Sequence, residues 1–377
     1  MKGLVSIYLD AFRFLAAMGV FLSHVQQHSA APGVLPVVSL DHKLVVFFFV
    51  ISGYVIAGSV SRPDATVAKY SADRLARLSS VVIPALAVTY FLDTIGSALS
   101  PQVYAGIDPH WQPLRFLANF FYLQQIWFLC VNPSSNAPLW SLGYEFWYYV
   151  LFGIWLFVKS SRAKILLLAL VSLVIGPKIL LLLPAWAVGA LAFHAGKNLQ
   201  CSFRAGLGLF IASGLGVAAA VAFTSELGLT NGKSGLPPLY YSSDYIRDNL
   251  FAAIVALHFF CCALFSKRLA VNFEPLPIVR FIRWLADHTF SLYVYHMPIL
   301  YFLRAVLGYD THNLFAVLSA MCLALLIIAG LSKITEERYA ALRIAARSWM
   351  AGFAGRMRPV AIKWKLSPAP VASGKAS

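Results

Sequence analysis

Long apolar segments follow one another along most of this 377-residue chain. Most are about 17 to 22 residues long, and a helix of that length crosses roughly 30 Å of hydrocarbon. The segments are continuously apolar rather than alternating, which favours helices over a transmembrane β-barrel. Hydrophobic residues make up 60% of the sequence and charged residues 12%, which excludes an ordinary soluble domain. The predicted fold is therefore an all-α polytopic membrane protein.

The apolar segments predict a bundle of about ten transmembrane helices. If the N-terminus is cytoplasmic, most lysines and arginines fall in segments on that same side. The positive-inside rule then predicts that both termini are cytoplasmic. A full span at residues 113–129 would invert every later loop, so we interpret that stretch as an external or re-entrant helix. The spans are predicted near residues 7–27, 43–60, 80–98, 138–158, 164–177, 179–195, 205–223, 248–265, 285–303 and 313–333.

The rest of the composition limits the domain organisation and the partners. Residues 1–340 are predicted to form one transmembrane domain, and residues 341–377 a basic cytoplasmic tail beside anionic lipid. The net charge of +15 could suggest nucleic acid, but the basic residues lie between apolar segments, so no nucleic-acid partner is expected. The five cysteines are scattered without metal-ligand spacing or a disulfide framework, and no metal is expected. The oligomeric state is left open.

The first apolar segment contains three ionisable residues, Asp10, Arg13 and His24. The two charges near its start argue against a cleaved signal peptide. Ionisable groups at membrane depth are costly, so each is a candidate site residue. The spacing from Arg13 to His24 amounts to three helical turns plus about 20°, so they share a face about 16 Å apart. That layout suits the two ends of a long substrate. An interhelical histidine and a structural Asp10–Arg13 pair are the alternative.

Three further polar groups have both a functional and a structural interpretation. Arg74 and Arg77, one helical turn apart, could hold phosphates or could be ordinary positive-inside residues. Glu145 lies among aromatic rings near the outer start of a span, where it could orient a histidine, accept a proton or bind a sugar. A hydrogen bond to another helix is its alternative, and the aromatic rings also fit an interfacial belt. His296 precedes Pro298, whose freed backbone carbonyls need partners.

Together these segments resemble the acyltransferase-3 family of membrane O-acyltransferases. Each motif alone would be weak, whereas the ordered set covers nearly the whole chain. The matching pieces are Leu9–Ala17 with His24, Phe47–Tyr54, Arg74-x-x-Arg77, Trp140–Glu145 and Ser291–Pro298.

The resemblance implies transfer of an acyl group, commonly acetyl from acetyl-CoA on the cytoplasmic side of a bacterial-type inner membrane. The implied acceptor is a hydroxyl of a glycan, a lipid-linked sugar or a related molecule. His24, through the Arg-x10-His pattern that starts at Arg13, becomes the catalytic candidate, either as a general base or through a transient acyl-histidine. Arg74 and Arg77 would hold coenzyme A phosphates, and Arg13 would help to position the donor.

The resemblance also suggests contacts with the acceptor. Glu145 would orient or polarise the acceptor side. The expected substrate-binding residues are Trp140, Ser141, Tyr144, Tyr293 and His296. The sequence departs from the family pattern at Lys43–Val46, where glycines often stand, so a close backbone approach is in doubt there. We expect a stand-alone form, without a fused external esterase-like domain after the last span.

Two other classes of function remain as alternatives. A polysaccharide or small-molecule transporter or flippase would also place polar groups at membrane depth, but it would more often show paired halves with matching broken helices. A structural or sensory membrane protein would leave the ordered arginine, histidine and glutamate motifs without a shared purpose.

Overall fold

The computed structural model describes residues 3–35, 40–223, 238–269, 273 and 275–354. Within these residues the chain is helical, and it contains no strand. The α-helices are α1 (Leu4–His28), α2 (Asp41–Val60), α3 (Val67–Leu99), α4 (Gln112–Phe120), α5 (Trp140–Phe157), α6 (Ser161–Ile175), α7 (Pro177–Asn198), α8 (Phe203–Phe223), α9 (Tyr245–Ser266), α10 (Pro277–Asp287), α11 (Thr289–Leu307) and α12 (Leu314–Ala354).

The helix lengths and hydropathy identify a multi-pass membrane protein. Among the described residues, eight helices are long and apolar enough to cross a membrane: α1, α2, α3, α7, α8, α9, α11 and α12. Two of the predicted spans do not meet these criteria. α6 has only 15 residues, and Tyr, Trp and Glu side chains lower the hydropathy of α5. The count of ten spans and the cytoplasmic termini therefore stay predictions. α4 has nine residues and is too short to cross a membrane. This length fits the interpretation of residues 113–129 as an external or re-entrant helix.

Three helix boundaries differ from those predicted. α3 begins at Val67 rather than near residue 80, because the Thr66 hydroxyl caps it by accepting the Lys69 N–H at 3.2 Å. The predicted span 285–303 is divided between α10 and α11, with the break at His288. α12 runs to Ala354, past the predicted end of the last span at residue 333, and residues 355–377 of the predicted tail lie outside the described part of the chain.

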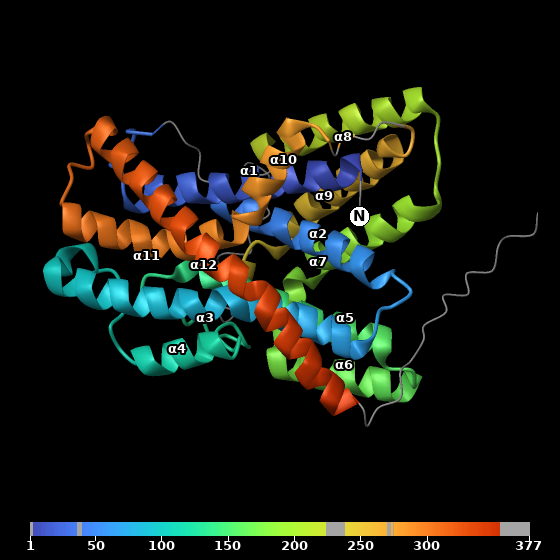
Figure 1. Cartoon of the computed structure of the whole chain (residues 1–377), viewed down its shortest axis with the longest axis horizontal. Coiled ribbons are helices and arrows are strands. Elements are labelled where there is room, and N and C mark those ends of the chain that lie inside the picture. The colour runs from blue at the N-terminus through green and yellow to red at the C-terminus, as the bar shows by residue number, and fades with distance from the viewer. Residues whose placement is uncertain (1–2, 36–39, 224–237, 270–272, 274, 355–377) are drawn as a thin grey trace, which may run out of the picture.

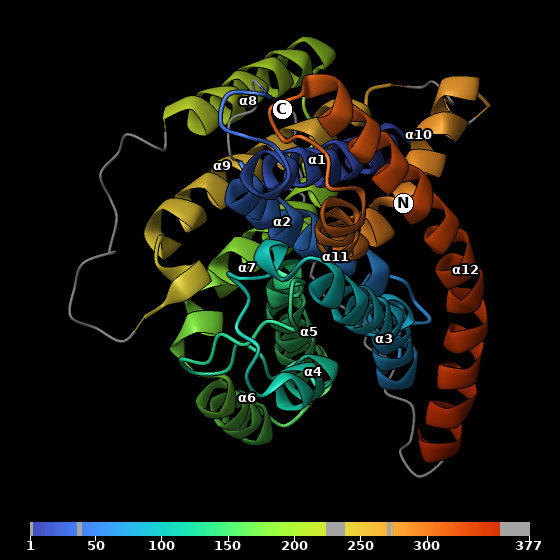
Figure 2. The same cartoon turned by 90° about the vertical axis from the view of Figure 1, so that its left-hand side faces the viewer.

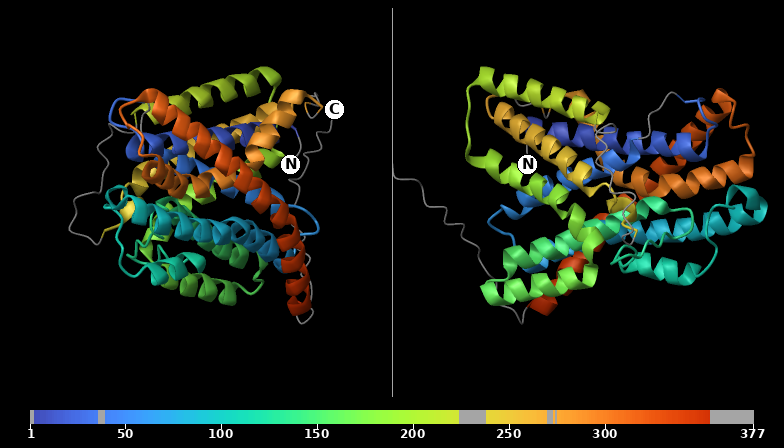
Figure 3. Two further views of the ribbon diagram at one scale, coloured as in Figure 1. Left: turned by 60° about the vertical axis from the view of Figure 1, so that its left-hand side comes forward. Right: turned by 180° about the vertical axis from the view of Figure 1, so that it is seen from behind.

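The helices are arranged around a polar centre formed by α1, α2, α3, α5 and α11. α2 packs against α1, α7 and α9, while α11 packs against α1, α3 and α12 (Figures 1 and 2). Figure 3 shows α8 along the outer side of α9, and α12 crossing the bundle. Within the apolar windows of these helices, 67% of α11 and 56% of α2 are buried, against 11% of α8. The outer helices therefore offer their apolar side chains to lipid.

Two glycines set the distance between α2 and α7. A Cβ atom added at Gly53 would lie 2.0 Å from the Trp186 carbonyl oxygen, and one added at Gly189 would lie 2.1 Å from the Val50 carbonyl oxygen. Small residues let membrane helices approach to backbone contact. At Lys43–Val46, where a close backbone approach was in doubt, the contact with α1 is made by a side chain, that of Leu44, which packs over Gly19.

We expect Gly189→Ala to destabilise the protein by about 1–3 kcal/mol, the usual cost of overpacking. The added methyl meets backbone of α2, which no side-chain rotation can relieve. Thermal unfolding in detergent measures the effect. Gly208→Ala is the matched control, because nothing lies within 4 Å of an added Cβ there and alanine is the better helix former. Equal unfolding temperatures for the two variants would contradict the prediction.

Candidate functional site

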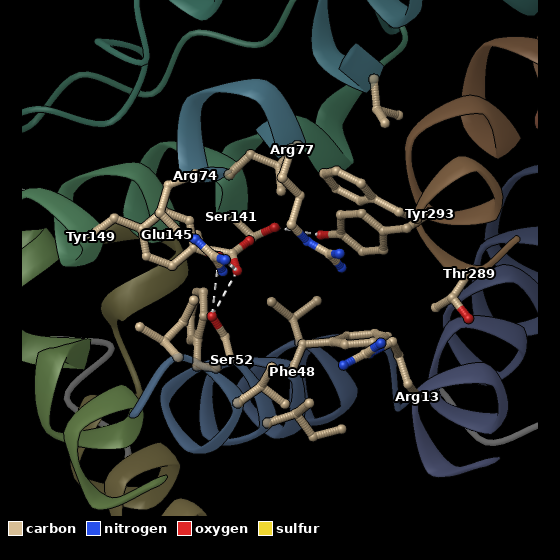
Figure 4. A pocket seen from close by; sticks show the side chains of 18 of the residues that line it. Arg13, Phe48, Ser52, Arg74, Arg77, Ser141, Glu145, Tyr149, Thr289 and Tyr293 are labelled. Atoms are coloured by element: carbon tan, nitrogen blue, oxygen red, sulfur yellow. Dashed lines mark hydrogen bonds between the residues drawn. The ribbon is translucent and has the colours of Figure 1, made fainter. Parts of the chain in front are cut away.

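A cavity of about 410 Å³ lies between α1, α2, α3, α5 and α11 (Figure 4). Its lining combines apolar residues, most of them from α2, with polar side chains from each of these helices and from the end of α10. Three arginines, two carboxylates and several hydroxyl groups face it together. The polar residues that line this cavity, named here the arginine cavity, are Arg13, Ser52, Arg74, Arg77, Ser80, Ser141, Glu145, Tyr149, Asp287, Thr289 and Tyr293.

The structure brings the three predicted arginines into this one cavity. α1 and α3 both begin at the same end of the bundle, so Arg13 faces Arg74 and Arg77 across the cavity (Figure 4). The guanidinium carbon of Arg74 lies 5.8 Å from the Tyr149 ring centre. Among the described residues, neither α3 arginine forms an ion pair with a carboxylate, and the buried Nε of Arg74 has no hydrogen-bond partner. The guanidinium N–H groups of Arg74 and Arg77 are therefore available to bind an anion.

Arg13 and Asp10 also form the pair that the spacing allowed. Their side chains are 3.6 Å apart, and Asp10 accepts a second contact from Arg283 of α10 at 2.9 Å. The pair does not withdraw Arg13 from the cavity, because Arg13 is among the lining residues. The structural pair is therefore present, and the functional role of Arg13 stays a prediction.

Glu145 lies in the arginine cavity and is held by hydroxyl groups. Its Oε1 accepts a hydrogen bond from the Ser52 hydroxyl at 2.7 Å and another from the Tyr149 hydroxyl. The Trp186 indole N–H donates in turn to Ser52 Oγ at 3.1 Å. These donors stabilise a carboxylate beside the arginines. The structure thus brings Glu145 to the arginines and not to His24, and its role toward the acceptor stays a prediction.

A second, smaller cavity of about 70 Å³ lies beside the first. Val45 and Tyr293 line both cavities and form the wall between them. We name this the histidine cavity, after the predicted catalytic candidate that faces it. Its lining is His24, Asp41, His42, Val45, Ala137, Pro138, Trp140, Tyr241 and Tyr293.

His24 is held from both sides of its imidazole ring. Its Nδ1 lies 2.7 Å from Nε2 of His296 on α11. Its Nε2 lies 3.7 Å from Oδ2 of Asp41 at the start of α2. His296 itself is fully buried and lines neither cavity. It therefore contacts His24 from behind rather than facing the space where a substrate would lie.

The other predicted substrate-binding residues differ in where they lie. Trp140 lines the histidine cavity, but Tyr241 covers one face of its indole, with ring centres 4.1 Å apart. Ser141 lines the arginine cavity and its hydroxyl is 2.7 Å from that of Tyr293. Tyr144 is fully buried, hydrogen-bonded to Ser242 at 2.9 Å, and lines neither cavity. The structure places Trp140, Ser141 and Tyr293 beside the cavities and leaves Tyr144 in the core.

Sequence reasoning did not single out several residues of the histidine cavity. His42 Nε2 lies 2.9 Å from the carboxylate of Asp248 on α9. Burial raises the pKa of Tyr241 to about 12, so its hydroxyl stays neutral. Asp41 and His42 are ionisable residues at the start of a long apolar segment, a signal that could have found them. Tyr241 lies in a short 3₁₀ turn and carries no such signal.

Pro298 leaves one backbone carbonyl of α11 without its helical hydrogen bond, and the sequence did not reveal which group pairs with that carbonyl. Proline has no N–H for the carbonyl four residues earlier, which is that of Val294. The side-chain amide of Asn136 donates to this carbonyl at 2.9 Å. This hydrogen bond joins the segment before α5 to α11 at Val294, two residues before His296. No group of three or more His, Cys, Asp and Glu side chains that could hold a metal ion occurs within the described ranges.

The fold and site define a helical multi-pass membrane protein with a cationic cavity beside a histidine cavity. Comparison with known proteins is consistent with the motifs. The family described as an acyltransferase domain matches residues 6–333. The chain therefore belongs to the acyltransferase-3 family, and the resemblance drawn from the motifs is confirmed.

One curated relative shares part of the sequence. An O-acetyl transferase of Shigella phage Sf6 is 30% identical over 166 residues, which cover 42% of this chain and 49% of the phage protein. The match thus spans about half the length of that relative. No solved structure matches the chain.

Proposed function

We propose that this protein is a membrane O-acyltransferase that moves an acyl group, with acetyl as the expected group, from acyl-CoA to an acceptor hydroxyl. The observation that carries the proposal is the juxtaposition of two cavities across one thin wall. One presents the guanidinium groups of Arg74 and Arg77, which form no ion pair with a carboxylate among the described residues, and the other is lined by His24, whose Nε2 lies on the side of Asp41. Anion-binding arginines suit coenzyme A phosphates, and a neutral imidazole suits proton transfer.

In the proposed reaction, Nε2 of His24 takes the proton of the acceptor hydroxyl while the oxygen attacks the thioester carbonyl. The tetrahedral intermediate then collapses, the C–S bond breaks, and the imidazolium returns the proton to the departing thiolate. Asp41, 3.7 Å from Nε2, would favour the positively charged imidazolium between the two steps. A transient acyl-histidine is the competing route.

The donor would enter at the end of the bundle where α1 and α3 begin. Its phosphates would bind Arg74 and Arg77, with Arg13 further along the cavity, and its long pantetheine arm would bring the thioester toward Val45 and Tyr293. We propose that this end is cytoplasmic, in a bacterial-type inner membrane, because the basic segments cluster there. Both chain termini would then lie on the cytoplasmic side.

The acceptor would enter the histidine cavity from the opposite end. Asp41 and Tyr241 offer polar groups to hydroxyls, and Trp140 offers an aromatic edge, a combination suited to a glycan or a lipid-linked sugar. The name of the phage relative, an O-acetyl transferase, favours acetyl as the group transferred. The cavity is small, so only the edge of a sugar that carries the reacting hydroxyl would fit.

The test uses membranes that contain the full chain, with acetyl-CoA labelled in the acetyl group. We expect label to appear in a glycan or lipid-linked fraction, with an acetyl-sized mass increase on that fraction. Membranes from cells without the gene are the control. Proteoliposomes that move an unmodified sugar across the bilayer and transfer no label would instead favour the transporter alternative, and they would refute the proposal.

A further inference from the structure

The buried histidine on α11 has both ring nitrogens engaged, and its two partners differ in kind. His296 Nδ1 lies 3.0 Å from the backbone carbonyl oxygen of Leu292, one turn earlier on the same helix. His296 Nε2 lies 2.7 Å from Nδ1 of His24 on α1. The two rings are nearly parallel, at 11°, with centres 5.0 Å apart. A separation that large, with nitrogens that close, fits an in-plane N–H···N hydrogen bond rather than face-to-face stacking.

These contacts determine where the protons lie. A carbonyl oxygen only accepts, so Nδ1 of His296 must carry a proton and donate it to Leu292. In a neutral imidazole the other nitrogen is then an acceptor. Neither hydrogen-bond partner of His296 is a carboxylate, so nothing in direct contact would support a second proton on this fully buried ring. Nε2 of His296 therefore accepts from Nδ1–H of His24.

The proton assignment continues to the cavity. Because His24 carries its proton on Nδ1, its lone pair is on Nε2. Nε2 is also the nitrogen that faces Asp41 in the histidine cavity. In the opposite tautomer, the lone pairs of His24 Nδ1 and His296 Nε2 would face each other across 2.7 Å, an unfavourable contact in a buried site.

We propose that His296 is a positioning residue that holds His24 in the tautomer whose free base faces the histidine cavity. It touches neither donor nor acceptor and acts only through His24. The proposal rests on the proposed acyl transfer. It adds to it the reason why Nε2 of His24, rather than Nδ1, removes the acceptor proton. It also reassigns His296, which the motif suggested as a substrate-binding residue.

His296 also joins α11 to α1, so a purely structural role must be considered. A structural role predicts that activity falls together with stability, whereas a positioning role predicts a loss of kcat in protein that stays folded. Two substitutions, compared in both activity and stability, separate the roles. In His296→Gln the side-chain amide reaches the position of Nε2 and its oxygen can still accept from His24. In His296→Asn the shorter amide reaches the position of Nδ1, so it can still donate to Leu292 but cannot meet His24. Asn keeps the local helix contact, and Gln keeps the contact between helices.

The experiment measures kcat, both KM values and the unfolding temperature in detergent for the two variants. We expect His296→Gln to keep kcat within about tenfold of wild type, and His296→Asn to lower it by about 10²-fold, the lower end of general-base contributions. Both KM values should change little, because His296 contacts no substrate. Wild-type kcat in His296→Asn would overturn the proposal. So would a loss of kcat in His296→Asn that is matched by a loss of folded protein or of unfolding temperature, because that is the result that a purely structural contact between α1 and α11 predicts.

The result can be separated from failure of the proposed function. If His24→Ala retains full acyl transfer, then the proposed role of His24 fails and the role of His296 fails with it. If His24→Ala is inactive while His296→Asn is as active as wild type, then only the positioning role is refuted. His296→Gln active and His296→Asn impaired, both folded, is the pattern that supports the positioning role.

Discussion

His24→Ala is expected to lower acyl transfer by about 10²- to 10⁴-fold, the range that a positioned general base contributes. The loss should appear in kcat rather than in the KM for acyl-CoA, since the arginines that are proposed to bind the donor phosphates line the other cavity. The His24 side chain is mostly buried but lines a cavity, so its removal enlarges an existing space and the fold should survive. Initial rates with labelled acetyl-CoA, on membranes matched for protein content, measure the effect.

The matched control is His28→Ala, one turn further along α1. His28 is a histidine of similar depth, with its Nδ1 3.3 Å from the Tyr301 hydroxyl, and it lines neither cavity. We expect it to retain most of the wild-type activity. If His24→Ala were fully active, or if both variants lost activity equally, then the assignment of His24 as the base would be wrong.

Arg74→Ala and Arg77→Ala are expected to raise the KM for acyl-CoA, each by roughly ten- to a hundredfold. A hydrogen bond to a charged group contributes about 1.5–3 kcal/mol, and each 1.4 kcal/mol is tenfold in affinity. The effect should be large because both guanidinium groups lack carboxylate partners among the described residues. Lysine at either position should recover only part of the loss, since it cannot form a bidentate contact.

The control for this pair is Arg62→Ala. Arg62 is an exposed arginine in the turn before α3, outside the arginine cavity. A general loss of positive charge at this end of the bundle would affect all three variants alike, whereas phosphate binding would affect only Arg74 and Arg77. An unchanged dependence on acyl-CoA concentration in Arg74→Ala and Arg77→Ala would rule out the phosphate contacts.

Hydrophobic length was enough to predict the helical membrane fold, because each apolar segment must satisfy its own backbone in lipid. Helical periodicity was also enough to place Arg13 and His24 on one face, and they line two adjoining cavities. The predicted helix boundaries were less accurate, because short local features of the sequence set where a helix begins or ends. The Thr66 cap lengthened α3, and the break at His288 divided a predicted span.

Contacts between helices could not be predicted in the same way. Helical spacing places Tyr149 one turn from Glu145 on α5, but nothing in the sequence around Glu145 indicates that Ser52 of α2 also holds it beside the arginines, because periodicity gives a face of a helix and not the residue that packs against it. Likewise, Pro298 indicated a backbone carbonyl without its helical hydrogen bond, but the sequence did not indicate that the side-chain amide of Asn136 would donate to this carbonyl. The contact between His24 and His296, 272 positions apart in the sequence, depends wholly on how α1 meets α11.

The wall formed by Val45 and Tyr293 has a consequence for the membrane as a permeability barrier. A protein that carried an intact, highly charged donor across the bilayer would need a wide polar passage, through which ions would also leak. Here the two cavities meet at a valine and a tyrosine. In an acyltransferase built this way, only the few atoms of the acyl group would cross the narrowest point. The cell could then modify molecules on one side with a reagent kept on the other, without dissipating its ion gradients.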